Sequence, residues 1–424
     1  MPGDDDPLRS LARTFARLEE LLERLPLDAG KDLRVRLATL RTVLLEKRPP
    51  ALVLVGRRGA GKSSLVNALF GAKMAELGHV TAQTGRGRWY TYARGGGSMR
   101  ILDTRGLQEG SLPAEADASD SALHSIGVEI RAQAPDVIVF VAKASEVDAA
   151  IDADLDALEQ VVGEVRRAHR LEPPIVAVVT HCDLLEPKAV RLHEPGKERP
   201  DDVEDKKRLV TLAENAVARK LDARDALRAR HVATLGVSGY MSWRSDGSLR
   251  ADERWRIDEL TGALFRHLPD AGRAELARAT QARAVQEELA STLTSATAAL
   301  CAGVAAVTFI PLDVVTLTAL QAGMVAGIAW IGGRTVDRRG ASEFMTGLGL
   351  QAGVAFGLRQ AARALIKLLA GAGGAVVSAA VAFTGTTAIG AAATAYYIRG
   401  VSLGDARKIF RREKPDAGPD SKKR

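Results

Sequence analysis

The chain has 424 residues, more than one hydrophobic core usually organises, and this length predicts two or three domains. Lys and Arg exceed Asp and Glu by seven, yet aromatic residues make up only 4% of the chain, so stacking platforms for nucleic-acid bases are scarce. Two distant cysteines, Cys182 and Cys301, and the acidic, proline-bearing residues 1–7 lead us to expect a reduced, cytosolic N-terminal half.

The N-terminal residues 8–48 carry Leu, Ala and Arg at roughly helical spacing. The pattern breaks at residues 26–30 and stops at Pro49 and Pro50, since proline cannot continue a helix. We therefore predict an N-terminal helical segment over residues 1–50, built as a helical hairpin that leads into the first strand.

Apolar runs alternate with helical stretches from residue 51 to about residue 268. Most of the runs are continuous, as the strands of a parallel sheet that is covered on both faces require. The predicted strands are 51–55, 99–103, 136–142, 174–180 and 231–238. This alternation predicts an α/β fold with a doubly wound, mostly parallel sheet.

A glycine-rich turn follows the first predicted strand. Its sequence, GRRGAGKS at residues 56–63, fits the phosphate-binding pattern G-x-x-x-x-G-K-[ST] and precedes a predicted helix. Backbone N–H groups of such a loop point at phosphates, and the helix dipole adds to the attraction. Lys62 is expected to reach the β and γ phosphates and Ser63 to bind Mg²⁺. The predicted nucleotide contacts are Gly56, Gly59, Ala60, Gly61, Lys62, Ser63 and Ser64.

Two later segments are expected to sense the γ-phosphate. A first switch needs a threonine hydroxyl on Mg²⁺, and GHVTAQTGRGRWY offers Thr84, which we prefer, and Thr81. The motif DTRG ends the second predicted strand, where Asp103 is expected to hold a water on Mg²⁺ and the Gly106 N–H to meet the γ-phosphate. The predicted catalytic residues are Lys62, Thr84 and Gly106, and the predicted metal contacts are Ser63, Thr84 and Asp103.

The motif THCD, at residues 180–183, ends a strong strand where a guanine-reading [NT]-K-x-D motif belongs. The Asp183 carboxylate can accept hydrogen bonds from two guanine donors that adenine lacks, and leaving it unpaired against adenine would cost about 1–3 kcal/mol. The alternative is that Asp183 caps the next helix. Thr180, His181 and Asp183 are the predicted base contacts, with His181 where lysine is usual, and a weaker match at Ser238 and Gly239 fits a guanine-supporting loop.

Charged residues are absent from three long runs in the C-terminal part, 289–312, 314–333 and 371–398. Each is close to or above the roughly 20 residues that span a bilayer, but buried helices of a compact bundle give the same pattern. Arg359, Arg363 and Lys367 recur at four-residue intervals, which fits an interfacial helix or the solvated face of a bundle helix. We predict a helical domain over residues 269–410 and a basic, disordered tail over 411–424.

The motifs GRRGAGKSSLVNALFG, QTGR, DTRGL and THCD together resemble the Era-like GTPases over residues 51–268. This resemblance implies a P-loop GTPase domain that binds GTP or GDP with Mg²⁺ and hydrolyses GTP. In that family the switch threonine follows an A-E-x-G stretch by six residues, and Thr84 lies six beyond Gly78. Leu107 stands where other GTPases orient water with glutamine, and Gly59 replaces a potassium-recruiting asparagine of some relatives, so we expect slow hydrolysis without a partner.

The Ala/Gly-rich segments near residues 290–400 resemble the YcjF-like domain of unknown function, which implies a membrane-associated all-α module. We therefore expect a GTP-binding switch coupled to this module at the inner face of the cell membrane. A GTP-binding scaffold with negligible hydrolysis and a ribosome- or RNA-associated assembly GTPase are the alternatives. The expected partners are a guanine nucleotide, a membrane, and a second copy or another protein, whereas nucleic acid is not expected.

Overall fold

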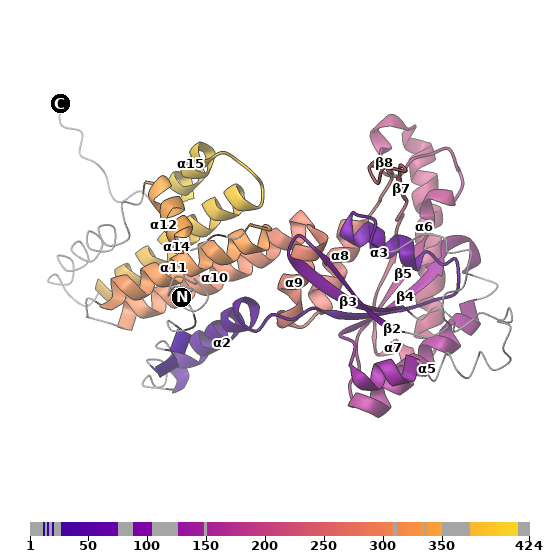
Figure 1. The fold of residues 1–424 in the computed structure, drawn as a ribbon, viewed down its shortest axis with the longest axis horizontal. Coiled ribbons are helices and arrows are strands. Elements are labelled where there is room, and N and C mark those ends of the chain that lie inside the picture. Colours follow the sequence, from indigo (N-terminus) through magenta and orange to yellow (C-terminus); the bar gives the residue numbers. More distant parts are fainter. Residues whose placement is uncertain are drawn as a thin grey trace. The chain divides into compact units, whose positions relative to one another are not determined.

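The computed structural model describes residues 12, 15, 16, 19, 20, 27–74, 88–103, 126–147, 151–307, 312–334, 336, 338–349 and 374–413. The chain divides into two compact units (Figure 1). One unit is Pro49–Ala282, and the other joins Met1–Arg48 to Arg283–Arg424. This division differs from the predicted domains, because residues 269–282 lie with the sheet and the N-terminal segment shares a unit with the C-terminal helices.

The first unit is built on a six-stranded sheet in the order β2-β3-β1-β4-β5-β6. Its strands are β1 (Ala51–Val55), β2 (Arg88–Arg94), β3 (Gly97–Asp103), β4 (Val137–Lys143), β5 (Ile175–Thr180) and β6 (His231–Gly236). β1 pairs in parallel with both β3 and β4, so the chain winds outward from it in both directions. Only β2 runs antiparallel to its neighbour, which confirms the predicted doubly wound, mostly parallel α/β fold.

Burial explains which strands the sequence predicts. Every residue of β1 and β5 is buried, and β4 is buried up to its last residue, so their sequences are continuous apolar runs. β2 was not predicted, because exposed and half-buried positions interrupt it at the edge of the sheet. The short hairpin of β7 (Met241–Trp243) and β8 (Leu249–Asp252) was not predicted either.

Helices cover the sheet of this unit. They are α3 (Lys62–Phe70), α5 (Ile151–His169), α6 (Pro200–Asp222), α7 (Asp225–Arg228), α8 (Ile257–His267) and α9 (Asp270–Thr280), and residues 126–132 are helical as well. One face of the sheet shares a core with α5 and α6, in which Phe140 packs with Leu158 and Val217. α9 packs against β3, and this contact explains why residues 269–282 belong to the sheet unit.

The described residues of the second unit form helices joined by turns and contain no strand, as predicted for an Ala/Gly-rich module. Its helices are α2 (Leu27–Leu44), α10 (Arg283–Val307), α11 (Leu312–Ile331), α12 (Arg338–Gly347), α14 (Gly374–Tyr397) and α15 (Leu403–Glu413). Glycines let these helices approach closely: Gly390 of α14 lies against Thr294 of α10, and Gly327 of α11 lies against Leu44 of α2. The α2–α10 contact accounts for the shared unit of the N-terminal and C-terminal segments.

No stretch of helix within the described residues has both the length and the hydropathy that a bilayer crossing needs. Arg359, Arg363 and Lys367, which the sequence places on one basic stripe, lie outside the described residues. The predicted disordered tail, residues 411–424, starts too early, because α15 continues to Glu413; residues 414–424 lie outside the described residues.

Candidate functional site

Glycine geometry shapes the turn between β1 and α3. A Cβ on Gly56 would overlap the backbone oxygen of Val141 in β4, so only glycine fits there. The Ala60 N–H donates to the Arg57 carbonyl (3.3 Å), and Gly59 between them has a left-handed φ of 80°. Backbone shape rather than space explains Gly59, because a Cβ there would meet nothing within 4 Å. The loop thus takes the curled form that its sequence predicts.

The N-terminus of α3 has features that favour an anion. Gly61 caps it in a left-handed conformation with a φ of 90°, no side chain accepts a hydrogen bond at the cap, and the first turn holds no acidic residue. Ser63 and Ser64 follow in that first turn. The first N–H groups of a helix lack partners within the helix, and its dipole favours negative charge at this end. These are the donors that a phosphate would use.

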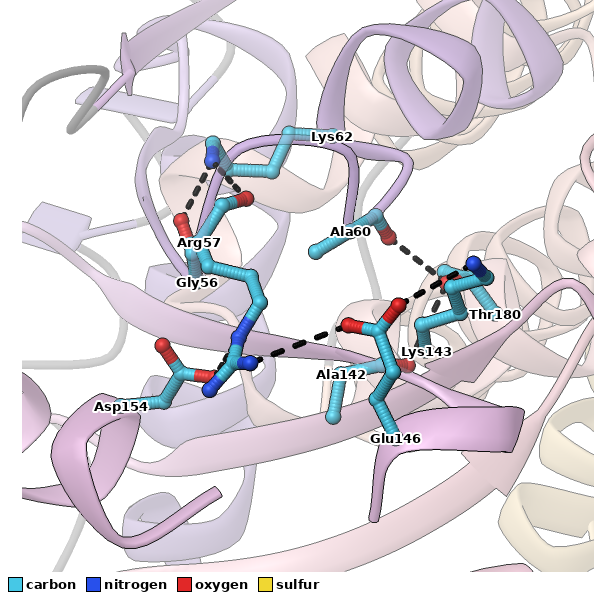
Figure 2. A network of polar contacts seen from close by, with 9 residues as sticks. All are labelled: Gly56, Arg57, Ala60, Lys62, Ala142, Lys143, Glu146, Asp154 and Thr180. Atoms are coloured by element: carbon cyan, nitrogen blue, oxygen red, sulfur yellow. Dashed lines mark hydrogen bonds and ion pairs between the residues drawn. The ribbon is translucent and has the colours of Figure 1, made fainter. Parts of the chain in front are cut away.

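Lys62, the first residue of α3, is 7% exposed and folds back over the loop (Figure 2). Its Nζ donates to the backbone oxygens of Gly56 and Arg57, the second at 2.8 Å. To contact a phosphate bound in this loop, the Lys62 ammonium must therefore leave these two backbone acceptors and donate to phosphate oxygens instead. The buried ammonium sits at the mouth of the loop, where the sequence predicts the contact with the β and γ phosphates.

The two loop arginines differ in their surroundings (Figure 2). Arg57 Nε donates to Asp154 Oδ2 of α5 at 2.8 Å, and its guanidinium lies 3.8 Å from Glu146, which also pairs with Lys143 at 3.1 Å. Asp154 is only 3% exposed, so this ion pair anchors the loop to α5. Arg58 is exposed and has no hydrogen bond or ion pair within the described residues. Only Arg58 thus has a guanidinium without a partner there.

Thr180 joins the THCD motif to the phosphate-binding loop. Its hydroxyl lies 2.6 Å from the Ala60 oxygen and 3.2 Å from the Ala142 oxygen, and the side chain is 4% exposed. The single hydroxyl proton goes to one of these carbonyls, so the His181 Nδ1 at 3.0 Å must donate to the hydroxyl oxygen. This fixes the ring of His181, and it holds the base motif beside the loop.

His181 has a left-handed backbone, with a φ of 57°, and its ring lies against Gly61. Burial lowers the pKa of His181, and the Asp183 carboxylate opposes this effect. The imidazole is therefore neutral at neutral pH. Burial also raises the pKa of the Cys182 thiol to about 12, which excludes a reactive thiolate at this position.

Asp183 lies in the short 3₁₀ turn Cys182–Leu184, and its carboxylate makes no hydrogen bond or ion pair within the described residues. The alternative was that Asp183 caps the next helix, but no side chain makes a capping hydrogen bond in this turn. The buried Lys206 of α6 fixes the backbone instead, since its Nζ donates to the carbonyls of Asp183 (2.6 Å), Val190 (2.9 Å) and Pro187 (3.2 Å). Sequence reasoning missed Lys206, because no motif marks a lysine 23 residues away.

The loop after β6 lies next to the base motif. The Val237 N–H donates to the Val179 oxygen (2.8 Å), and the Cys182 N–H donates to the Val237 oxygen (3.3 Å). Ser238 follows directly, is 1% exposed, and exchanges two backbone hydrogen bonds with Trp255 (3.2 and 3.0 Å). A Cβ on Gly239 would lie 3.4 Å from the Ser64 oxygen of α3.

The structure thus gathers most of the predicted contacts at the carboxyl ends of β1, β5 and β6. The residues brought together are Gly56, Gly59, Ala60, Gly61, Lys62, Ser63, Ser64, Thr180, His181, Asp183, Ser238 and Gly239. The backbone of Asp103 ends β3 beside Leu54 of β1. Thr84, its rival Thr81 and Gly106 lie outside the described residues. Within the described part of the chain, no group of three His, Cys, Asp or Glu side chains suits a metal ion.

Part of the chain is similar to known proteins. Residues 51–181 match the family described as 50S ribosome-binding GTPase. Two curated proteins of Escherichia coli (strain K12), the uncharacterized proteins YfjP and YkfA, are 32% and 30% identical to this chain over 140 residues. Each match covers 32% of this chain, which spans 43% of the length of either relative.

Solved structures that resemble the chain do so weakly. Toc33 from Arabidopsis thaliana in complex with GDP and Mg²⁺ is 17% identical, with a TM-score of 0.34, and covers 60% of this chain and 94% of its own. Era in complex with MgGDPNP and nucleotides of 16S ribosomal RNA is 16% identical, with a TM-score of 0.33, and covers 60% of this chain and 68% of its own. Residues 51–181 thus match a GTPase family, and the sheet with its glycine-rich loop fits a P-loop GTPase domain.

Proposed function

We propose that this protein is a GTP-binding switch, which hydrolyses GTP to GDP with Mg²⁺ and conveys its nucleotide state to the helical unit. The bond between the Thr180 hydroxyl and the Ala60 oxygen carries the proposal, because it fixes the base motif against the phosphate loop. The Asp183 carboxylate, three residues further along the chain, makes no hydrogen bond or ion pair within the described residues. A carboxylate accepts from both guanine donors, which supports a preference for guanine over adenine.

The phosphate end of the proposal rests on Lys62 and on the start of α3. The N–H groups at the start of α3 would supply donors, and the Lys62 ammonium would supply a positive charge once it leaves the Gly56 and Arg57 oxygens. During in-line attack of water on the γ-phosphate, charge develops on the transferred oxygens, and a cation held there stabilises it. Lys62 therefore serves both binding and hydrolysis.

Mg²⁺ fits the residue types that surround the loop. The Ser63 hydroxyl belongs to the first turn of α3, and Asp103 ends β3 one strand away from the loop. Ser63 would hold the ion directly and Asp103 through a water, with Thr84 as the third predicted contact. Bound Mg²⁺ would neutralise phosphate charge.

Slow turnover is part of the proposal, because Leu107 occupies the place of a water-orienting glutamine. Without a partner, the expected rate is on the order of 10⁻⁴ to 10⁻² per second. Phosphate release from GTP by the intact chain tests this, with Lys62→Ala as the inactive variant. Lys73→Ala, which removes an exposed lysine just beyond α3, is the matched control.

The expected outcome is slow release by the wild type and by Lys73→Ala, and loss of nucleotide binding in Lys62→Ala. Unchanged GTP affinity in Lys62→Ala would refute the assignment of this site. Binding without release of phosphate would leave the scaffold alternative, in which GTP only orders the protein.

The helical unit is proposed to act at the inner face of the membrane, from the surface of the bilayer. Support comes from α15, whose exposed residues include four basic ones: Arg407, Lys408, Arg411 and Arg412. Anionic headgroups attract such residues, and the attraction weakens with salt. Recovery of the intact chain with membranes, and its release by a carbonate wash, is the expected fractionation. Recovery in the soluble fraction before the wash would refute this location.

Ribosome association is the second candidate function, favoured by the match to the family described as 50S ribosome-binding GTPase. Sedimentation through sucrose distinguishes it from the membrane proposal. Co-sedimentation of the intact chain with 50S particles, dependent on GTP, would support the ribosome. Its absence at low salt would remove this candidate.

A further inference from the structure

The hairpin of β2 and β3 lies between the two segments that are predicted to sense the γ-phosphate. β2 begins at Arg88, four residues after Thr84, and β3 ends at Asp103 within the DTRG motif. The two strands pair in register from Arg88 with Asp103 to Arg94 with Gly97. A hairpin held this way transmits a shift at one end as a shift of the whole ribbon.

The turn of this hairpin is fitted tightly onto α9. The run Gly95, Gly96 and Gly97 faces the last turns of the helix, and a Cβ on Gly97 would lie 2.5 Å from the Ala279 nitrogen and 2.6 Å from the Glu275 oxygen. Both of these atoms belong to the helix backbone, which cannot yield as a side chain can. The glycine run is therefore a docking surface for α9.

Buried polar groups lock the same contact. Glu275 of α9 accepts hydrogen bonds from the Ser98 N–H (2.8 Å) and the Ser98 hydroxyl (3.2 Å) through one carboxylate oxygen. Glu275 is 8% exposed and Arg278 is 6% exposed, and the Arg278 side chain lies against Gly96. Charged groups this buried tolerate little displacement, because they would lose partners in a region of low dielectric. Hairpin and helix should move together.

The chain passes between the two units at two places. Both of them lie next to the β2–β3 hairpin and α9. The first crossing lies between Arg48 and Pro49, and the next residue, Pro50, accepts a hydrogen bond from the Arg100 N–H of β3 (2.8 Å). Gly272 of α9 packs on Pro50, since a Cβ there would lie 3.2 Å from the proline Cβ. One stretch of β3 and α9 therefore holds the chain that arrives from α2.

The second crossing lies between Ala282 and Arg283, where α10 begins. Two residues separate it from the end of α9, and one of them, Gln281, has a left-handed φ of 56°. A Cβ on Gly95 would lie 2.7 Å from Gln281 Nε2, so the hairpin turn also contacts this crossing. A displacement of the hairpin would reach both crossings through direct contacts.

We propose that the β2–β3 hairpin and α9 form the device that conveys the nucleotide state to the helical unit. The inference rests on the proposed GTP switch and specifies how that switch is read. Binding energy that distinguishes GTP from GDP would bias the hairpin position, and α9 would carry that bias to α2 and α10 through the two crossings.

Amide hydrogen exchange of the intact chain tests the device, measured in α2 and α10 with GDP and with a slowly hydrolysed GTP analogue. Gly97→Ala is the test variant, because its methyl group would push the hairpin off the α9 backbone. Gly163→Ala in α5 is the control, because a Cβ there meets nothing within 4 Å. Glu275→Gln is a second test variant, which keeps the side-chain shape and removes the charge. The affinity for each nucleotide is measured in parallel.

The wild type and Gly163→Ala should show exchange in α2 and α10 that depends on the nucleotide. Gly97→Ala should reduce this dependence about fivefold or more while it still binds GDP, and Glu275→Gln should reduce it to a smaller extent. A full response in either test variant would overturn the inference alone. Failure of the wild type to bind guanine nucleotide would overturn the proposed function and the inference with it.

Discussion

Thr180→Val is the sharpest perturbation of the contact between the base motif and the phosphate loop. Valine keeps the shape of threonine but removes the hydroxyl that lies 2.6 Å from the Ala60 oxygen. Because Ala60 is 1% exposed, its carbonyl would lose a partner away from water, and the expected loss of stability is about 1–3 kcal/mol. The Kd for GDP should rise about tenfold, equivalent to ~1.4 kcal/mol, because the loop and Asp183 are no longer held together.

Thr261→Val is the matched control for this measurement. Thr261 is 1% exposed, and its hydroxyl donates to the Ile257 oxygen (2.8 Å), an acceptor that keeps its backbone partner within α8. Urea denaturation would give the stabilities and fluorescence titration with labelled GDP the affinities. The reasoning is refuted if Thr180→Val loses no more stability than Thr261→Val and binds GDP as the wild type does.

Three further predictions concern side chains of the same site. Arg57→Ala should lower stability by about 1–3 kcal/mol because it leaves Asp154 buried without this ion pair, whereas Arg58→Ala should stay within about 0.5 kcal/mol of the wild type, both read from denaturant midpoints. His181 has a lowered pKa, so its contribution to stability is present above pH 6.5 and is lost as the pH falls. His181→Asn should therefore flatten this part of the curve of unfolding free energy against pH. Cys182 should resist alkylation at neutral pH until the chain unfolds, as peptide mass spectrometry would show.

Each of these predictions has a contrary result. Equal stability losses from Arg57→Ala and Arg58→Ala would contradict the anchoring role of the first arginine. An acid-side profile that His181→Asn leaves unchanged would show that another group titrates there. Rapid labelling of the native thiol at Cys182 would mean that this strand end opens readily.

The core strands could be predicted because strands that are buried on both faces consist of continuous apolar residues. Continuous apolar runs identify β1, β4 and β5, and the loop motif identifies the start of α3. β2 has no such apolar run, because it lies at the sheet edge and its residues are exposed or half-buried. Its residues also belong to the stretch in which the motifs place the first switch.

The motifs predicted which residues gather at the site but not how they are held. Arg57 and Arg58 are adjacent and chemically identical, and only the position of Asp154, 97 residues later, distinguishes their roles. Lys206 orders the turn that carries Asp183 from a different helix. Contacts of this kind depend on the folded arrangement of distant segments. For the same reason the sequence placed α9 with the helical domain, although Gly97 and Glu275 attach it to the sheet.

The central claim is that Asp183 reads guanine. It is tested most directly by the affinities of the intact wild-type chain and of its Asp183→Asn variant for GDP and for xanthosine diphosphate (XDP). Xanthine keeps the N1–H donor of guanine but presents an acceptor in place of the amino group, so it suits an amide that donates and accepts. The wild type should prefer GDP by at least about 100-fold, and Asp183→Asn should reverse that preference. Equal affinities in the wild type, or a preference for GDP that survives Asp183→Asn, would contradict the assignment.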